Sequence, residues 1–293
     1  MTIRRRNART VGLLLIPVLA LVLLLLVIPQ LRMLDISLRF RLPFDQVGTA
    51  ADVHTLSNYI EFIQEPLYWK VFVKTIYAAL TITVVSFIIA FPIAYYLAKV
   101  SSGSWRRRLL VLILIPFWVN EIVRTFAWLL ILTEQGVLNQ ALRALGLIQD
   151  PVSYLYRDST VTLGMAYAYM LFMLFPLFAV LDSLDFSLVE AAQDLGAGNA
   201  RVLRHVILPH ALPGAIAGGI MVFMLSVGTY VVPDILGGKG AIWFVQIIYR
   251  RFYDALNWNL GSAFSFVLLA LSMGFVAIVL RIFGLSVRRA IRS

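Results

Sequence analysis

Residues 11–29 read VGLLLIPVLALVLLLLVIP, a run without a charged side chain that follows an N-terminal decapeptide with four arginines. An α-helix needs about 20 apolar residues to cross the hydrocarbon core of a bilayer, so this run is long enough to span a membrane. A cleaved signal peptide is the alternative, but residues 29–32, Pro-Gln-Leu-Arg, lack the small residues of a cleavage site. We therefore expect a retained first transmembrane helix.

The composition of the whole chain indicates that lipid is its main solvent. Hydrophobic residues make up 61% of the 293 residues, and charged residues make up only 14%. So few charges cannot solvate the surface of a soluble chain of this length. We predict an all-α, polytopic membrane protein with one transmembrane domain over residues 1–293. Its six expected spans are residues 11–29, 71–98, 109–132, 160–181, 211–236 and 261–283.

Basic residues are concentrated in three short flanks of these spans: the first ten residues, the 99–108 loop and the C-terminal tail. Lysine and arginine in short loops remain on the cytoplasmic side, so we expect both termini to be cytoplasmic in a bacterial inner membrane. The net charge of +10 arises largely from such clusters. This pattern fits contact with an anionic leaflet better than contact with nucleic acid.

Several kinds of site are excluded by residue type. The chain has no cysteine, and its three histidines form no HExxH pattern, so we expect no disulfide, metal site, cofactor or catalytic residue. Residues 237–240, Gly-Gly-Lys-Gly, lack the spacing and the final hydroxyl of a phosphate-binding loop. Any ATP that drives this protein must therefore be hydrolysed by a separate subunit.

The expected cytoplasmic loop at residues 182–210 is longer than a simple helix connection needs. Asp185 or Ser187 can cap a helix that begins near Leu188, and Gly196 can end it in a left-handed conformation. A second short helix is expected from about Asn199 until Pro209 opens the next span. The loop is thus predicted to be two short helices joined by a sharp bend.

The same loop resembles the EAA loop of bacterial importer permeases. Three residues separate Glu190-Ala191-Ala192 from Gly196, and nine residues separate Gly196 from Val206-Ile207-Leu208-Pro209, where the family pattern has Ile-x-Leu-Pro. The only departure is Val206. The resemblance implies an ATP-binding-cassette importer of type I, in which this loop docks into the cytoplasmic ATPase. The implied coupling residues are Glu190, Ala191, Ala192, Asp194, Gly196, Arg201, Leu208 and Pro209.

The resemblance extends over most of the chain. Residues 58–59, 66–68, 116–118, 124–128, 136–139 and 228–238 are similar to the subfamily that includes spermidine/putrescine permeases. Thr229 departs from it, because an acidic or aromatic residue often stands there. The implied solute is a polyamine such as putrescine or spermidine, or a related amine or amino-acid-like compound.

Two charged residues lie inside the expected third span. Glu121 and Arg124 are three residues apart on one helix face and could pair with each other. Because a charge at the bilayer centre costs about 2.5–3.5 kcal/mol on insertion scales, such residues are either functional or fix helix packing. Both alternatives remain open: the pair could line the translocation path or be a structural ion pair.

A second candidate group lies at the outer end of the fifth span. A carboxylate beside an aromatic face attracts an alkylammonium by charge pairing and cation–π attraction. Asp234 with Tyr230 could form such a site, with Trp128 supplying a second face. Alternatively, Asp234 caps the outer loop and the aromatic residues only pack.

The resemblance also implies the partners: a cytoplasmic ATP-binding subunit that is expected to be a dimer, a second permease subunit that we expect to be related rather than identical, and a periplasmic solute-binding protein. The first rival is a secondary transporter driven by an ion gradient, which would need coupling carboxylates near the midplane. Glu121 alone is thin support for that. The second rival, an intramembrane enzyme, lacks a nucleophile with a histidine partner in the spans.

Overall fold

The computed structural model describes residues 16–43, 46, 48–50, 52–238 and 241–283. These residues are mostly helical, with one isolated antiparallel bridge between Arg39 and His54. Among them, five helical stretches are long and apolar enough to cross a membrane, or six if one pair bent by 90° counts as a single span. The predicted all-α, polytopic fold is thereby confirmed. The stretches are Ile16–Ser37, Pro66–Val100, Asp158–Asp182, Asn199–Gly228 and Trp258–Ile282, and the bent pair is Gly103–Trp118 with Glu121–Ala144.

The chain divides into two compact units, Met1–Trp69 with Ile247–Leu271 and Lys70–Gln246 with Ser272–Ser293. The first unit holds η1 (Leu23–Val27), α2 (Ile28–Ser37) and α3 (Ser57–Gln64). Three helices contribute residues to both units: α4 (Pro66–Tyr95), α13 (Phe244–Tyr253) and α14 (Trp258–Ile282). That the whole chain forms one transmembrane domain stays a prediction.

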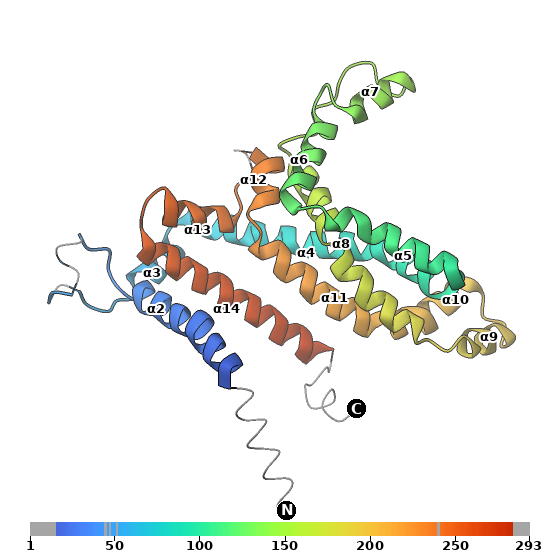
Figure 1. Ribbon diagram of the computed structural model, residues 1–293, viewed down its shortest axis with the longest axis horizontal. Coiled ribbons are helices and arrows are strands. Elements are labelled where there is room, and N and C mark those ends of the chain that lie inside the picture. Colours follow the sequence, from blue (N-terminus) through green and yellow to red (C-terminus); the bar gives the residue numbers. More distant parts are fainter. Residues whose placement is uncertain (1–15, 44–45, 47, 51, 239–240, 284–293) are drawn as a thin grey trace, which may run out of the picture. The chain divides into compact units, whose positions relative to one another are not determined.

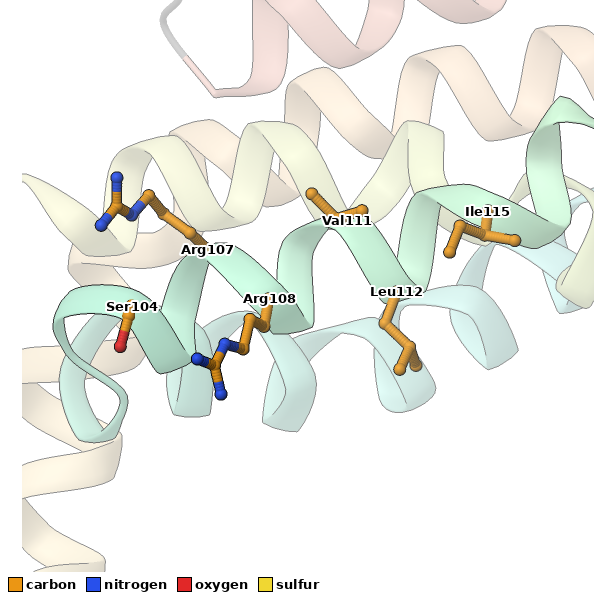
Figure 2. A pocket seen from close by; sticks show the side chains of 6 residues that line it. All are labelled: Ser104, Arg107, Arg108, Val111, Leu112 and Ile115. Carbon is orange, nitrogen blue, oxygen red and sulfur yellow. The ribbon is translucent and has the colours of Figure 1, made fainter.

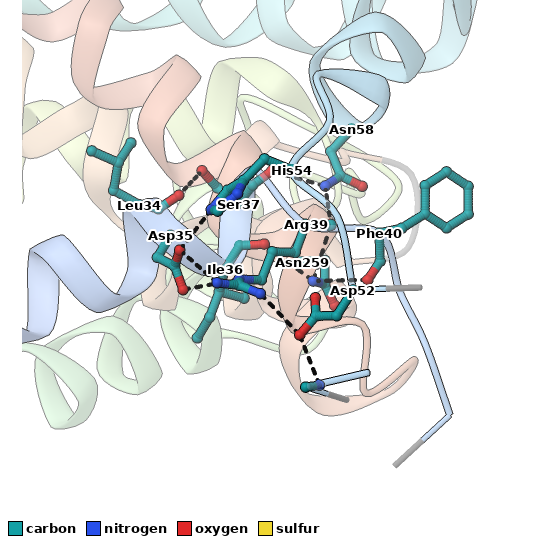
Figure 3. Close-up of polar contacts among 11 residues, drawn as sticks. Leu34, Asp35, Ile36, Ser37, Arg39, Phe40, Asp52, His54, Asn58 and Asn259 are labelled. Atoms are coloured by element: carbon teal, nitrogen blue, oxygen red, sulfur yellow. Dashed lines mark hydrogen bonds and ion pairs between the residues drawn. The ribbon is translucent and has the colours of Figure 1, made fainter. Parts of the chain in front are cut away.

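Polar side chains hold the turn that follows α2 in the first unit (Figure 3). The Arg39 guanidinium lies 3.0 Å from a carboxylate oxygen of Asp35 and 2.9 Å from one of Asp52. The side-chain amides of Asn58 and Asn259 both donate to the Arg39 carbonyl, at 2.9 and 3.1 Å. Hydrogen bonding to Arg39 holds the pKa of the Asp52 carboxyl below its usual value. The network therefore fastens three separate segments of the first unit.

The first predicted span ends too early. Residues 11–15 lie outside the described residues, but the helix continues past Pro29 to Ser37. Proline normally disrupts a helix because it has no N–H and its ring crowds the carbonyl four residues back. Here the turn Leu23–Val27 is widened into a π-helix, in which the N–H of Ile28 donates to the Leu23 carbonyl. This wider turn accommodates the proline, so the helix does not end there.

The second unit is built around α8 (Asp158–Asp182) and α11 (Leu208–Gly228), which pack side by side (Figure 1). A Cβ atom on Gly214 would lie 2.6 Å from the Pro176 carbonyl oxygen, and one on Gly218 would lie 2.9 Å from the Met173 Cα. Small residues four apart thus allow a close antiparallel approach. The unit also contains η3 (Tyr96–Val100), α5 (Gly103–Trp118), α6 (Glu121–Leu132), α7 (Val137–Ala144), α9 (Ser187–Asp194), α10 (Asn199–Val202), η4 (Leu203–Ile207) and α12 (Val231–Gly237).

The expected span over residues 109–132 is broken by a bend of 90°. Pro116 cannot donate a backbone hydrogen bond, and α5 ends two residues later at Trp118. Val119 and Asn120 have the ψ angles of extended backbone. The Asn120 side chain then caps α6 by accepting a hydrogen bond from the Ile122 N–H. The chain therefore bends sharply inside an apolar run.

The expected span over residues 211–236 is also interrupted. Helix α11 ends at Gly228, Thr229 has the ψ angle of extended backbone, and α12 begins at Val231. Pro233 cannot donate to the Thr229 carbonyl, which disfavours an unbroken helix. In the first turn of α12 the missing N–H costs little, because no intrahelical acceptor is available there.

Candidate functional site

The loop between α8 and α11 contains the bend that the sequence predicts. Helix α9 begins at Ser187, whose backbone N–H donates to an Asp185 carboxylate oxygen at 3.0 Å. At its end, Gly196 has a φ of +80° and donates to the Gln193 carbonyl, and Ala197 donates to the Ala192 carbonyl. These two bonds form a Schellman motif, which favours glycine at the left-handed position. The predicted helix near Leu188 and the stop at Gly196 are confirmed.

The two sides of this loop differ in burial. Leu184, Val189 and Val202 are buried against the rest of the second unit. On the other side, Leu188 is 54% exposed and Leu195, next to the bend, is 89% exposed. Large apolar side chains with this exposure, beside small and polar residues, are typical of a surface that another protein covers.

The base of the loop is held by cationic side chains from other helices. The Lys99 ammonium, at the end of η3, donates to the carbonyls of Asp182 and Leu184 at 3.2 and 2.6 Å. Arg106 of α5 forms an ion pair with the Asp182 carboxylate at 2.7 Å. His210 of α11 contacts the Val180 carbonyl at 3.0 Å. Lys99 and Arg106 thus join the start of the loop to η3 and α5, and His210 joins α11 to the end of α8.

The predicted coupling residues lie together on or beside this loop. Glu190, Ala191, Asp194, Gly196, Arg201 and Pro209 are exposed, and Ala192 and Leu208 are partly buried. One expectation is wrong: the second helix does not stop before Pro209, because α10, η4 and α11 form one continuous stretch from Asn199 to Gly228. The Leu208 N–H donates to the Leu203 carbonyl, and this widened π-turn accommodates Pro209.

Glu121 lies at the first position of α6, not in the middle of a span. Its carboxylate is favoured there by the positive end of the helix dipole. The carboxylate oxygen Oε1 accepts a hydrogen bond from the Tyr169 hydroxyl of α8 at 3.0 Å. Tyr169 also interacts with the side chain of Thr229, at the break between α11 and α12.

Arg124 lies one turn further along α6 and makes different contacts. Its guanidinium carbon is 4.6 Å from the centre of the Phe117 ring and 5.6 Å from that of Tyr167. Among the described residues it has no ion pair with Glu121, and its buried NH1 atom has no hydrogen-bond partner. The proposed Glu121–Arg124 pair is therefore wrong. Stacking on aromatic faces stabilises the cation instead.

Glu121 and Arg124 both line an open cleft of about 800 Å³ within the second unit. Its walls are mostly apolar and come from the bend between α5 and α6, from α8 and from α11. Tyr169, Phe172 and Phe175 of α8 add aromatic surface to the cleft, and the Tyr169 hydroxyl contacts the Glu121 carboxylate. A cleft with few polar groups on apolar walls is the usual form of a small-molecule site.

The other three candidate residues do not line this cleft. Trp128 packs edge-on against Tyr167, with ring centres 5.4 Å apart. Asp234, in the first turn of α12, accepts a hydrogen bond from the buried Gln246 side chain at 3.1 Å. Tyr230 directly precedes α12. The structure brings Glu121 and Arg124 together in one cleft and leaves Trp128, Tyr230 and Asp234 outside it.

Sequence reasoning missed two residues that organise these sites. Tyr169 was not singled out, although it links Glu121 to the break at Thr229. Lys99 was counted only as a basic flank, although it holds the base of the loop. A lysine directly after an apolar run gives no signal in the sequence that distinguishes these two roles.

Comparisons with known proteins agree on the kind of protein. Residues 90–292 match the family described as binding-protein-dependent transport system inner membrane component. The spermidine/putrescine transport system permease protein PotB of Escherichia coli is 32% identical over 252 residues, which cover 86% of this chain and 90% of PotB. PotB of Haemophilus influenzae is 33% identical over 238 residues, covering 81% of this chain and 82% of that protein.

The fold is also found in solved structures. The chain aligns with a bacterial alginate ABC transporter in complex with an alginate pentasaccharide-bound periplasmic protein, with a TM-score of 0.71 and 16% identity. That alignment covers 94% of this chain and 93% of the other. A second structure, of a bacterial ABC transporter involved in the import of alginate, gives a TM-score of 0.68 at 17% identity, covering 95% of this chain and 96% of that one. No support for an ion-coupled transporter comes from these relatives.

Proposed function

This chain belongs to the family of binding-protein-dependent transport system inner membrane components, and from that premise we propose a role in import for its loop and another for its cleft. It is a multi-pass inner-membrane permease of an ATP-binding-cassette importer. We propose that the whole chain acts as one permease domain whose loop 182–210 couples ATP hydrolysis on a separate subunit to movement of a solute. Both termini would then be cytoplasmic.

The exposed bend at Gly196 is the observation that carries the coupling proposal. Leu188 and Leu195 would enter a groove of the cytoplasmic ATPase, and Ala191 would allow close backbone approach beside them. Glu190, Asp194 and Arg201 would form the polar rim of this contact. Ala192, Leu208 and Pro209 would support the exposed surface from behind.

Movement of the docked loop would reach the spans through its base. Lys99, Arg106 and His210 bind carbonyls or the carboxylate at the end of α8. Closure of an ATPase dimer would therefore displace the ends of η3, α5, α8 and α11 together. Such a concerted shift is what alternating access needs.

For the solute path, we propose the cleft that contains Glu121 and Arg124. An open cleft on one subunit can form one wall of the solute path. A second, related permease subunit would form the opposite wall and close the cleft. A periplasmic solute-binding protein would deliver the solute from the outer side. The alginate transporter was solved with such a protein bound.

The proposed solute is a polyamine such as putrescine or spermidine, or a related amine. Two relatives that cover most of this chain are named for these compounds. The Glu121 carboxylate beside Tyr169 offers an alkylammonium both charge and an aromatic face. Arg124, held against Phe117, would repel a second ammonium group and so keep the solute moving past the carboxylate. Trp128, Tyr230 and Asp234 would act nearer the outer end of the path.

The test is uptake of labelled putrescine and spermidine into proteoliposomes. The proteoliposomes would hold the full transporter, assembled with its ATPase, its second permease subunit and its binding protein. We expect ATP-dependent uptake that persists when the proton gradient is collapsed. Replacement Glu121→Gln removes the charge but keeps the shape. Because a hydrogen bond to a charged group is worth about 1.5–3 kcal/mol, uptake at low solute concentration should fall by roughly 10-fold or more.

Glu61→Gln serves as the matched control, because Glu61 is an exposed carboxylate on α3. If Glu121→Gln and Glu61→Gln transport polyamines equally well, Glu121 is not on the path. If the wild-type transporter hydrolyses ATP in response to its binding protein but imports no polyamine, the solute assignment fails while the coupling proposal stands.

A further inference from the structure

One face of α5 carries an open depression of about 490 Å³, and its lining residues all belong to this helix (Figure 2). It is lined by Ser104, Arg107 and Arg108 near the start of the helix, and by Val111, Leu112 and Ile115 further along. Figure 2 shows all six side chains projecting from this one helix. The depression therefore has a polar, cationic end and an apolar continuation.

The three consecutive arginines of α5 have different environments. Arg106 points inward, where it pairs with Asp182 at 2.7 Å and lies 4.7 Å from the centre of the Phe178 ring. Arg107 and Arg108 are exposed, and neither makes a hydrogen bond or ion pair with another described residue. Two adjacent cations are thus left without a counter-charge at the end of an apolar helix.

The apolar part has the length of one membrane leaflet. Val111, Leu112 and Ile115 are 58%, 64% and 56% exposed. From Arg107 to the end of α5 at Trp118 the helix rises about 16 Å at ~1.5 Å per residue. Half of the hydrocarbon core is about 15 Å thick. Arginines at the helix start therefore lie at headgroup depth when the apolar residues face acyl chains.

We propose that this depression binds an anionic phospholipid of the adjacent leaflet. The lipid phosphate would lie between the Arg107 and Arg108 guanidinium groups and accept a hydrogen bond from the Ser104 hydroxyl. One acyl chain would lie along Val111, Leu112 and Ile115. Charge selects the anionic headgroup, because arginines near a membrane surface attract anionic lipids by about 1 kcal/mol each. The apolar continuation selects a lipid over a free phosphate ion.

The experiment is native mass spectrometry of the full chain in mild detergent, titrated with phosphatidylglycerol and, in parallel, with phosphatidylcholine of the same acyl chains. We expect tighter binding of phosphatidylglycerol. Replacing both arginines (Arg107→Gln with Arg108→Gln) should weaken that binding about 30-fold, and each single replacement about 5-fold. Removing two other exposed arginines (Arg143→Gln with Arg157→Gln) lowers the net charge equally and should leave the binding unchanged.

A third variant separates lipid from phosphate. Leu112→Ser with Ile115→Ser keeps both arginines and should weaken phosphatidylglycerol binding several-fold. The proposal is overturned if the two lipids bind equally, if the Arg143/Arg157 control loses as much affinity as the Arg107/Arg108 variant, or if inorganic phosphate displaces the lipid. It is also overturned if a benzophenone side chain at position 112 photo-cross-links to the second permease subunit in the assembled transporter, because protein then covers this face.

Discussion

The replacement Gly196→Val tests the bend of the loop most directly. Gly196 has a φ of +80°, a conformation that L-residues rarely adopt. A Cβ atom at this position would have no neighbour within 4 Å, so the new side chain would meet open space. The cost is therefore confined to the backbone, about 1–2 kcal/mol for an ordinary residue in the left-handed region. A β-branched residue lies at the upper end of that range.

This cost acts on the bend and not on the folded spans. Roughly 2 kcal/mol reduces the population of the bent loop relative to any straighter alternative by about 30-fold. We expect Gly196→Val to reach the membrane in normal amount and to bind the ATPase weakly. Solute-stimulated ATP hydrolysis and uptake should fall together in proteoliposomes. Basal hydrolysis by the ATPase should remain.

Two controls make the result specific to backbone conformation. Gly198 is also free of neighbours within 4 Å but has an ordinary φ of −68°, so Gly198→Val adds the same side chain without strain. Gly196→Asn places a residue at the bend that tolerates the left-handed region better than other side chains. Both should retain most of the transport. If Gly196→Val transports as well as Gly198→Val, the reasoning about the bend is refuted.

Two further predictions concern packing and pH. Gly214→Ala would place a Cβ 2.6 Å from the Pro176 carbonyl oxygen, so we expect α8 and α11 to move apart at a cost of about 1–3 kcal/mol. This cost should lower the melting temperature of the protein in detergent. The control Gly274→Ala has no neighbour within 4 Å and should not lower the melting temperature in the same detergent. The pKa of the Asp185 carboxyl lies below its usual value of about 4, mainly because the carboxylate accepts a hydrogen bond from the Ser187 backbone N–H, and to a lesser extent because of the Ser187 hydroxyl and Lys99. The stability that the Asp185 carboxylate gives to α9 is therefore fully present above the usual value. It is lost as the pH falls through the lowered pKa. A spin label at position 188 should therefore report an unchanged loop from pH 8 to 5 and a more mobile one only in stronger acid, and that acid transition should be absent in Asp185→Asn.

Local chemistry made the loop predictable from the sequence. Asp185, Ser187 and Gly196 act on backbone groups within a few residues of themselves, so the start and the stop of α9 can be read from the residue types alone. The five or six helical stretches that are long enough to cross a membrane were predictable for a similar reason, because an apolar run of sufficient length requires no knowledge of its neighbours.

Contacts between distant segments could not be predicted in this way. The Glu121–Tyr169 hydrogen bond joins residues 48 positions apart, and Lys99 reaches a carbonyl 85 positions away. The sequence allows a pairing of Glu121 with Arg124, because the two residues lie three positions apart on one helix. The break at Asn120 moved Glu121 to a helix start, where Tyr169 became its partner.

The two places where a predicted span breaks are connected through one side chain. Tyr169 donates to Glu121 after the first break and interacts with Thr229 at the second. Helix α12, which follows the second break, packs against both α6 and α8. Broken helices expose backbone groups that an apolar environment cannot satisfy, and they are tolerated where they are buried in protein or line a cavity. Glu121 lines the cleft at the first break, so that departure from regular helix marks the polar part of the proposed path. A Tyr169→Phe variant would keep the ring and remove only this link.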